Sequence, residues 1–152
     1  MSNALTLTLR VRYAECDAQQ VVFNSRYAEY ADLAATEYMR VLVGGYKELI
    51  KQGIDNQLVN MNISWKNPAR FDDILSLKIW ISKVGNSSFT LNVEVSEHGS
   101  QKPIADIEIV YVVVHATEFK KLPITDEFRH KLLAGPKVKH IDLAGLNYIE
   151  DR

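Results

Sequence analysis

The chain has 152 residues, of which 47% are hydrophobic and 24% charged, a composition typical of a folded globular protein. Its 18 basic and 19 acidic residues leave a net charge of -1, which argues against nucleic acid as a partner. The single cysteine, Cys16, excludes an internal disulfide, and no apolar run reaches the ~20 residues that cross a bilayer. The first ten residues lack a signal-peptide pattern, so we expect a cytoplasmic protein without a membrane partner.

The N-terminal third predicts a strand followed by a long helix. Residues 5–12 alternate strictly between apolar and polar side chains, as in a half-buried strand. Residues 25–43 predict a helix with Asn24 or Ser25 as its N-cap and a Gly-Gly pair at its end. Its polar side chains fill a sector of about 140° on a helical wheel, and four alanines lie in or beside the apolar arc. We therefore expect a helix that is mostly enclosed.

Four more alternating runs predict strands joined by short turns, at residues 58–66, 74–84, 88–97 and 104–115. In the first of them one face is predicted to consist of Val59, Met61, Ile63 and Trp65. The last run loses its alternation at residues 110–114, as a central strand covered on both faces would. A short helix is predicted at residues 126–134, ended by Gly135 and Pro136.

The order of these elements predicts an α+β fold, in which a five-stranded antiparallel sheet is wrapped around one long helix. The helix would be ~28 Å long and a ten-residue strand ~33 Å, so the sheet can curl along the whole helix. No repeat or linker interrupts the chain. We expect residues 1–152 to form a single domain, with a core at about 5–129 and a C-terminal helix and tail at 126–152.

Two blocks of sequence carry a motif pattern. The first, VRYAECDAQQVVFNSRYAEYADLAATEY, covers residues 11–38 and holds the pair Glu15-x-Asp17. The second, WKNPARFDDILSLKIWISKVGNSSFTLNVEV, covers residues 65–95 and holds Pro68-Ala69-Arg70 and Gly85-x-Ser87-Ser88-Phe89. Together they resemble the hot-dog-fold acyl-CoA thioesterases of the 4-hydroxybenzoyl-CoA thioesterase type. The resemblance implies a hot-dog fold and an acyl-CoA substrate, which hydrolysis would split into free CoA and a carboxylic acid.

The resemblance also implies site residues. In this family a loop aspartate before the helix attacks the thioester carbonyl or activates a water, and Asp17 occupies its place. The backbone N–H of Asn24, at the positive end of the helix dipole, would stabilise the developing oxyanion. Substrate contacts are expected from the residues that match the family elsewhere: Val22, Phe23, Tyr27, Asp32, Arg70, Lys83, Asn86, Ser87 and Ser88. The last five would meet CoA, whereas the polar surroundings of Asp32 on the helix also suit plain solvation.

One position departs from the family pattern. Gln20 stands three residues after the aspartate, where the family usually has glycine, which would permit a positive φ. The neighbouring residues have plainer interpretations. Glu15 is expected to be structural or exposed, and Cys16 a small packed residue, because no histidine lies near it in the sequence.

Thioester hydrolysis makes modest chemical demands. The leaving thiol has a pKa of about 8.5, so it departs as a thiolate with little help. We therefore expect no cofactor, and no metal, because the four histidines lack metal-ligand spacing. Two alternatives remain: a non-catalytic module that binds acyl-CoA, and a hot-dog hydratase or dehydratase. The latter needs a histidine near the helix, and residues 1–97 contain none.

Self-association is the last expectation. By resemblance, two subunits join their sheets edge to edge and build the active sites between their helices, which gives a dimer or a tetramer. An open sheet would otherwise leave its edge strands unpaired.

Overall fold

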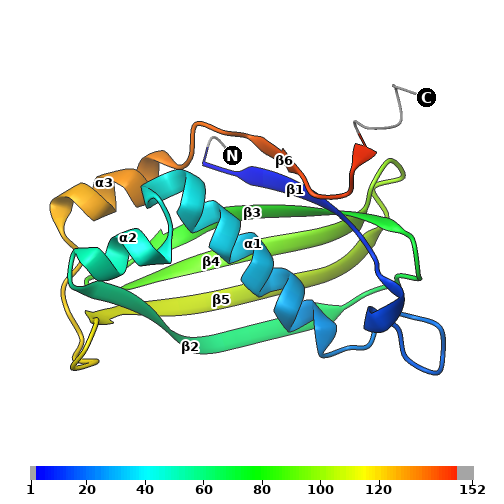
Figure 1. The fold of residues 1–152 in the computed structure, drawn as a ribbon, viewed down its shortest axis with the longest axis horizontal. Helices are drawn as coiled ribbons and strands as arrows, with labels where there is room; N and C mark the ends of the chain where they lie inside the picture. The colour runs from blue at the N-terminus through cyan, green and yellow to red at the C-terminus, as the bar shows by residue number, and fades with distance from the viewer. Residues whose placement is uncertain (1–2, 147–152) are drawn as a thin grey trace.

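The computed structural model describes residues 3–146, which form one large sheet with helices against one of its faces (Figure 1). The strands are β1 (Leu5–Arg10), β2 (Ile54–Trp65), β3 (Ile74–Val84), β4 (Ser88–Glu97), β5 (Pro103–His115) and β6 (His140–Asp142). The helices are the short 3₁₀ helix η1 (Tyr13–Glu15), α1 (Arg26–Val43), α2 (Tyr46–Lys51) and α3 (Asp126–Ala134). None of these helices is long and apolar enough to cross a membrane.

The strand order is β2-β5-β4-β3-β1-β6. Neighbouring strands are antiparallel except β1 and β6, which run parallel. The predicted sheet wrapped around one long helix is confirmed, and Figure 1 shows α1 lying across the curled sheet. The predicted number of five strands is wrong within the described residues, because β6 adds a sixth. Three residues are too few to reveal a strand by alternation.

The core lies between α1 and the sheet. The helix contributes Ala31, Ala34 and Ala35, all fully buried, and these small side chains let the strands approach its axis. The polar sector predicted for the helix includes Asp32 and Arg40, which are exposed. The prediction of an enclosed helix is therefore confirmed.

The edge strand β2 differs from its prediction. A β-bulge between Leu58 and Asn60 shifts the register, so that Leu58, not Val59, continues the face of Met61, Ile63 and Trp65. These four residues pair with buried residues of β5, and so they look toward the side of the sheet that carries α1. Exposure along this face is uneven: Met61 and Ile63 are half-buried against the core, whereas 47% of Leu58 and 53% of Trp65 are exposed, because no further strand or helix covers the sheet edge.

The interior position of β5 is confirmed. This strand lies between β2 and β4, and the consecutive residues Val113 and Val114 are both buried. Two buried neighbours on a strand must point to opposite faces, so both faces of the sheet are covered here. Within residues 110–114 the second face is covered only at Val114, because Val110 and Val112, which share that face, are half-buried.

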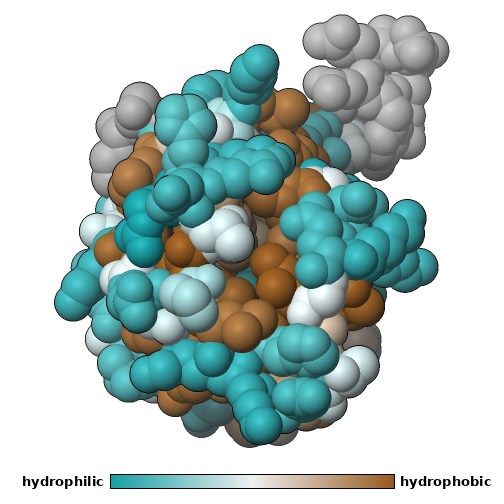
Figure 2. All heavy atoms as spheres, turned by 90° about the vertical axis from the view of Figure 1, so that its left-hand side faces the viewer, coloured by the Kyte–Doolittle hydropathy of each residue, from teal (hydrophilic) through white to brown (hydrophobic). Residues whose placement is uncertain are grey.

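The helices α2 and α3 close one end of the sheet. Gly44, in the left-handed region with φ 90°, ends α1 as expected, but the six-residue α2 follows at once and was not foreseen. α3 has the predicted bounds, and the Thr125 side chain caps it by accepting from the Phe128 N–H. Figure 2 views this end, where apolar side chains surface within a polar surround; Val43, Leu49 and Phe128 line a shallow hollow there.

Candidate active site

Asp17 lies on a tight hairpin loop between η1 and α1. Cys16 and Val22 face each other in an antiparallel bridge. Between them the Asp17 N–H donates to the Val21 carbonyl, and the Gln20 N–H donates to the Asp17 carbonyl, each at 2.9 Å. Gln20 has a φ of 66°, so it adopts the left-handed conformation that a glycine would favour. This conformation costs a non-glycine residue ~1 to 2 kcal/mol.

The two carboxylate oxygens of Asp17 are in different situations. Oδ1 accepts a hydrogen bond of 2.8 Å from the Gln19 N–H, which closes an Asx turn. Oδ2 has no partner among residues 3–146, and the side chain is half-buried. The loop therefore orients the carboxylate through one oxygen and leaves the other available for chemistry.

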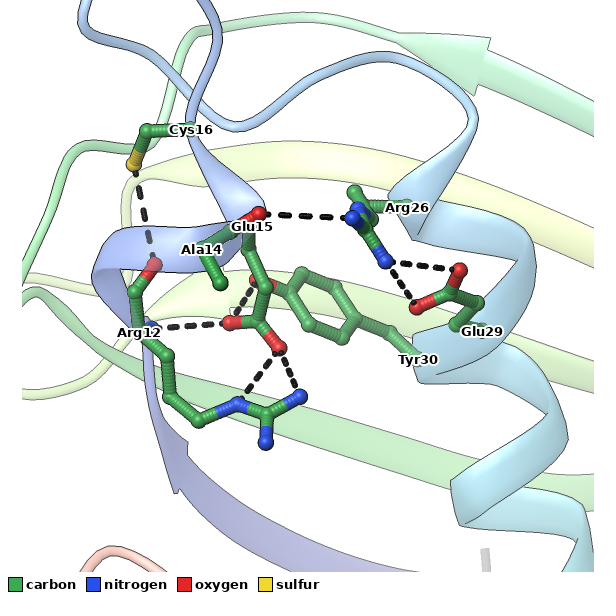
Figure 3. A network of polar contacts seen from close by, with 7 residues as sticks. All are labelled: Arg12, Ala14, Glu15, Cys16, Arg26, Glu29 and Tyr30. Carbon is green, nitrogen blue, oxygen red and sulfur yellow. Dashed lines mark hydrogen bonds and ion pairs between the residues drawn. The ribbon is translucent and has the colours of Figure 1, made fainter.

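A buried carboxylate behind this loop ties η1 to α1 (Figure 3). Glu15, only 5% exposed, accepts from the Arg12 N–H (2.8 Å) and from the Tyr30 hydroxyl (2.9 Å) through Oε1. Its Oε2 accepts from the Arg12 guanidinium at 3.0 Å. Burial, and next the hydrogen bond to Glu15, raise the pKa of Tyr30, so its hydroxyl stays protonated and donates. Glu15 is therefore structural, and buried where the sequence left exposure open.

Cys16 lies beside this network. The thiol is half-buried, with Sγ at 3.9 Å from the Arg12 carbonyl (Figure 3). Burial, followed by the nearby carboxylates of Glu15 and Asp17, raises the pKa of Cys16. Its environment thus disfavours the thiolate, which supports a packed residue over a nucleophile.

The start of α1 presents backbone donors. Ser25 is the N-cap residue, and its side chain makes no capping hydrogen bond. The carbonyls of Phe23 and Asn24 accept from the N–H groups of Arg26 and Tyr27, at 2.9 and 3.4 Å. The N–H of Asn24 itself has no acceptor within the part of the chain that the structure describes. An unpaired N–H at the positive end of an 18-residue helix favours a negative charge.

Asp17 and Asn24 line the same hollow, of about 540 Å³. Three predicted substrate contacts, Val22, Phe23 and Tyr27, also line it. The other walls come from the loop and from the end of β2 with the residues after it: Gln19, Val21, Trp65, Lys66, Asn67 and Pro68. Sequence reasoning assigned no site role to Trp65, Lys66 or Asn67. The sequence carried no signal for these three residues, because the place of β2 at the sheet edge does not follow from its alternation.

Two other predicted contacts lie outside this hollow. Asp32 is exposed on α1 and lines a separate surface hollow with Tyr30 and Leu33. Arg70 forms an antiparallel bridge with Val21, and its N–H donates to Asp73 Oδ2 at 2.9 Å, which places it next to the Asp17 loop. The backbone of Arg70 is thus next to the Asp17 loop, while Asp32 is set apart from it.

The remaining predicted contacts, Lys83, Asn86, Ser87 and Ser88, lie at the far end of β3. The length of that strand separates them from the Asp17 loop by ~33 Å. Ser87 is buried, and its carbonyl accepts from the Val113 N–H at 2.8 Å. Their role with CoA stays a prediction, and it requires that this turn reach a site on another chain.

Comparison with known proteins places the chain in a family. Residues 19–104 match the family model of the thioesterase superfamily. The long-chain acyl-CoA thioesterase FadM of Escherichia coli (strain K12) is 25% identical over 124 residues, 82% of this chain and 93% of FadM. The 4-hydroxybenzoyl-CoA thioesterase of Pseudomonas sp. (strain CBS-3) is 24% identical over 139 residues, 90% of this chain and 94% of that protein. The chain spans only 53% of YneP from Bacillus subtilis (strain 168), which is 29% identical over 73 residues.

Solved structures agree in fold. A thioesterase superfamily protein from Jannaschia sp. CCS1 has a TM-score of 0.82 at 19% identity, covering 91% of this chain and 96% of that chain. A mutant 4-hydroxybenzoyl-CoA thioesterase in complex with 4-hydroxybenzoyl-CoA has a TM-score of 0.78 at 17% identity, covering 86% and 99%. The family match spans more than half of the chain, and the resemblance to this family is confirmed. The chain belongs to the thioesterase superfamily and has its hot-dog fold.

Proposed function

We propose that the protein hydrolyses acyl-CoA thioesters to free CoA and a carboxylic acid, with Asp17 as the reacting group. The observation that carries this proposal is the placement of Asp17 and Asn24 on the walls of one hollow. One supplies a carboxylate oxygen without a described partner, and the other an unpaired N–H. The names of the relatives, which include acyl-CoA thioesterases, support the same reaction.

The chemistry follows from these two groups. In one route Asp17 Oδ2 attacks the carbonyl carbon, the C–S bond breaks, CoA leaves as a thiolate and water hydrolyses the resulting anhydride. In the other route the carboxylate takes a proton from a water molecule, which attacks the carbon directly. In both routes the carbonyl oxygen becomes an oxyanion, which the Asn24 N–H stabilises. The thiolate needs no general acid, since the pKa of a thiol is about 8.5.

The two alternatives fit the hollow less well. A hydratase or dehydratase needs a histidine for proton transfer at carbon, and no histidine lines the hollow within residues 3–146. A module that only binds acyl-CoA gains nothing from a carboxylate beside the thioester, because an unpaired charge there costs desolvation energy. Hydrolysis uses both the Asp17 carboxylate and the unpaired Asn24 N–H.

The test of this function is release of CoA from butanoyl-, benzoyl- and palmitoyl-CoA by the purified protein. We expect turnover of at least one of them at ~1 s⁻¹ or faster, the range of ordinary enzymes. EDTA should leave the rate unchanged, since residues 3–146 hold no cluster of metal-binding side chains. The proposal is wrong when no member of the panel is hydrolysed above the buffer rate. Loss of activity with EDTA, restored by a divalent ion, would contradict the metal-free mechanism.

We also infer that the chain self-associates through β2. This strand ends the sheet, and its apolar face exposes Leu58 and Trp65. Trp65 belongs to that face and also lines the Asp17 hollow, so a second chain on β2 would close one wall of the site. Pairing would remove an unpaired edge, which proteins avoid leaving open.

A charge placed on β2 tests this assembly. Leu58→Lys should lower the mass measured by sedimentation to that of one chain, because Leu58 is 47% exposed in one chain and a lysine there would be buried in the interface without a partner. Asn62→Lys puts the same charge on the opposite face of the strand, where residue 62 is exposed, and should leave the mass unchanged. A wild-type protein that sediments as a single chain would refute the inference.

A further inference from the structure

A second hollow lies against the Asp17 loop. Its volume is about 270 Å³, and its lining residues are Tyr13, Cys16, Asp17, Gln20 and Phe71. None of these except Asp17 also lines the larger hollow that holds Asn24. Asp17 is thus the one residue shared by two hollows of different character. A thioester has two arms, the acyl group and CoA, and both must find room beside the reacting carboxylate.

Two aromatic rings form the outer wall of this second hollow. Tyr13 and Phe71 meet edge to face, with ring centroids 5.8 Å apart, although 80% of Tyr13 and 55% of Phe71 are exposed. Two backbone hydrogen bonds join the segments that carry these rings. The Val11 N–H donates to the Asp73 carbonyl at 2.9 Å, and the Val11 carbonyl accepts from the Asp72 N–H at 3.0 Å. The two rings therefore come from segments that are joined by backbone hydrogen bonds, and they offer an exposed apolar surface beside Asp17 that a ligand can cover.

Charge distinguishes the two hollows. The second hollow contains no lysine, arginine or histidine, and its only charged residue is Asp17. The larger hollow contains Lys66, whose Nζ is paired with Asp106 at 2.6 Å, and the N-terminal end of α1. CoA carries phosphates, which proteins bind with cations and helix N-termini. The second hollow is thus unsuited to CoA and suited to an uncharged group.

Resting on the proposed function, we propose that the hollow of Tyr13, Gln20 and Phe71 holds the acyl group, while CoA extends through the larger hollow. Its volume lies just below the ~300 to 1,000 Å³ of common ligand pockets, which selects a compact acyl group such as a single ring. A ring bound there adds a third member to the edge-to-face pair. Gln20, held at φ 66° by the loop, forms one wall and limits the size of the group.

Acyl specificity tests this assignment. We would measure kcat and KM for benzoyl-CoA and dodecanoyl-CoA. Inhibition by free CoA would report separately on the binding of the CoA part of the substrate. Tyr13→Ala and Phe71→Ala should each lower kcat/KM for benzoyl-CoA roughly tenfold or more, because the ring loses its apolar contacts. Inhibition by free CoA should stay as in the wild type. Phe119→Ala is the matched control, because Phe119 is 59% exposed and follows the end of β5 that lies farthest from Trp65 and the Asp17 loop.

A variant that enlarges the hollow of Tyr13, Gln20 and Phe71 should change the acyl preference in favour of a longer chain. Gln20→Gly removes a wall, and the ratio of kcat/KM for dodecanoyl-CoA over benzoyl-CoA should rise roughly tenfold. The assignment is wrong if the Tyr13 and Phe71 variants behave as Phe119→Ala does. It is also wrong if they weaken inhibition by free CoA by as large a factor as they lower kcat/KM for benzoyl-CoA. Those results leave the hydrolase function intact. A wild-type protein that hydrolyses other acyl-CoAs but not benzoyl-CoA refutes this assignment alone, and one that hydrolyses no acyl-CoA tested refutes the function and this assignment together.

Discussion

The two ends of the sheet are built differently. At the end that carries Asp17, three residues other than glycine adopt a left-handed conformation, namely Gln20, Asp72 and Gln101, and the Asn24 N–H is unpaired. The opposite end contains one such residue within residues 3–146, Phe119. Its β3–β4 turn is closed by hydrogen bonds: Gly85 accepts from Arg129 at 2.9 Å, and Asn86 and Ser87 accept from Ile124 and Val113 at 2.8 Å.

This difference separates residues that build the fold from residues that can meet a ligand. The serine and asparagine of the β3–β4 turn are chemically able to bind CoA, but their backbone carbonyls already hold the turn against β5 and the segment that leads to α3. The Asp17 loop instead keeps strained backbone and free polar atoms, which a protein tolerates where a ligand will use them. Unmet hydrogen-bonding capacity is therefore a better guide to this site than residue type.

After the loss of Asp17 itself, the largest effect on turnover should come from deleting the unpaired Asn24 N–H. Asn24→Pro removes the N–H just before α1, where proline is tolerated, and should lower turnover ~10² to 10³-fold. Asn24→Ala keeps the N–H and should be mild, within ~0.5 kcal/mol in stability, since the side chain makes no described hydrogen bond. Circular dichroism and gel filtration establish folding before the assay. Equal rates for the two folded variants would place the oxyanion contact elsewhere.

A smaller effect should follow from loosening the support of the Asp17 loop. Tyr30→Phe removes the hydroxyl that donates to the Glu15 carboxylate, and should cost ~1.5 to 3 kcal/mol in free energy of unfolding. Tyr38→Phe is the matched control on the same helix, because that hydroxyl donates to the neutral Asn3 carbonyl at 2.8 Å and is worth ~0.5 to 1.5 kcal/mol. Urea unfolding measures both values. A larger loss for Tyr38→Phe would contradict the role given to Glu15.

The smallest effect, on the free energy of unfolding, should come from relieving the left-handed backbone conformation of Gln20. Gln20→Gly should raise the free energy of unfolding by ~0.5 to 1 kcal/mol, because relief of the left-handed conformation exceeds the entropy that glycine loses on folding. Gln101→Gly, at φ 62° in the β4–β5 turn, should stabilise by a similar amount without changing acyl preference. Destabilisation by Gln20→Gly in the same urea titration would mean that its side chain holds the loop.

The sequence predicted elements wherever a periodic run ended in turn residues. β3, β4 and α3 have the predicted bounds for that reason. β1 is shorter than predicted, because Val11 exchanges its hydrogen bonds with the loop before β3. α2 and β6 were missed because they hold six and three residues, too few for a period to show. The exposure of β2 depends on its place at the sheet edge, which alternation does not reveal.

Part of the site was also within reach of the sequence. Asp17, Val22, Asn24 and Tyr27 come from one short segment, so a local motif was enough to group them. The wall from Trp65 to Pro68 arrives through long-range contacts, in which Val21 bridges Arg70 and the Val22 N–H donates to Ala69 at 2.8 Å. No periodicity encodes such contacts. Gln20 was singled out as a missing glycine, and the structure shows that glutamine adopts the positive φ itself.

The most direct test of the central claim is the turnover of Asp17→Asn against that of Asp72→Asn. The asparagine at 17 can still accept the Gln19 N–H and close the loop, but it can neither attack the thioester nor take a proton. Asp72 is an exposed carboxylate at φ 68°, a conformation that asparagine tolerates, and it lies outside both hollows. We expect Asp17→Asn to lose at least ~10³-fold in kcat, and Asp72→Asn to match the wild type. A folded Asp17→Asn protein that keeps more than about a tenth of wild-type turnover, a loss under ~1.4 kcal/mol in barrier, would contradict the account.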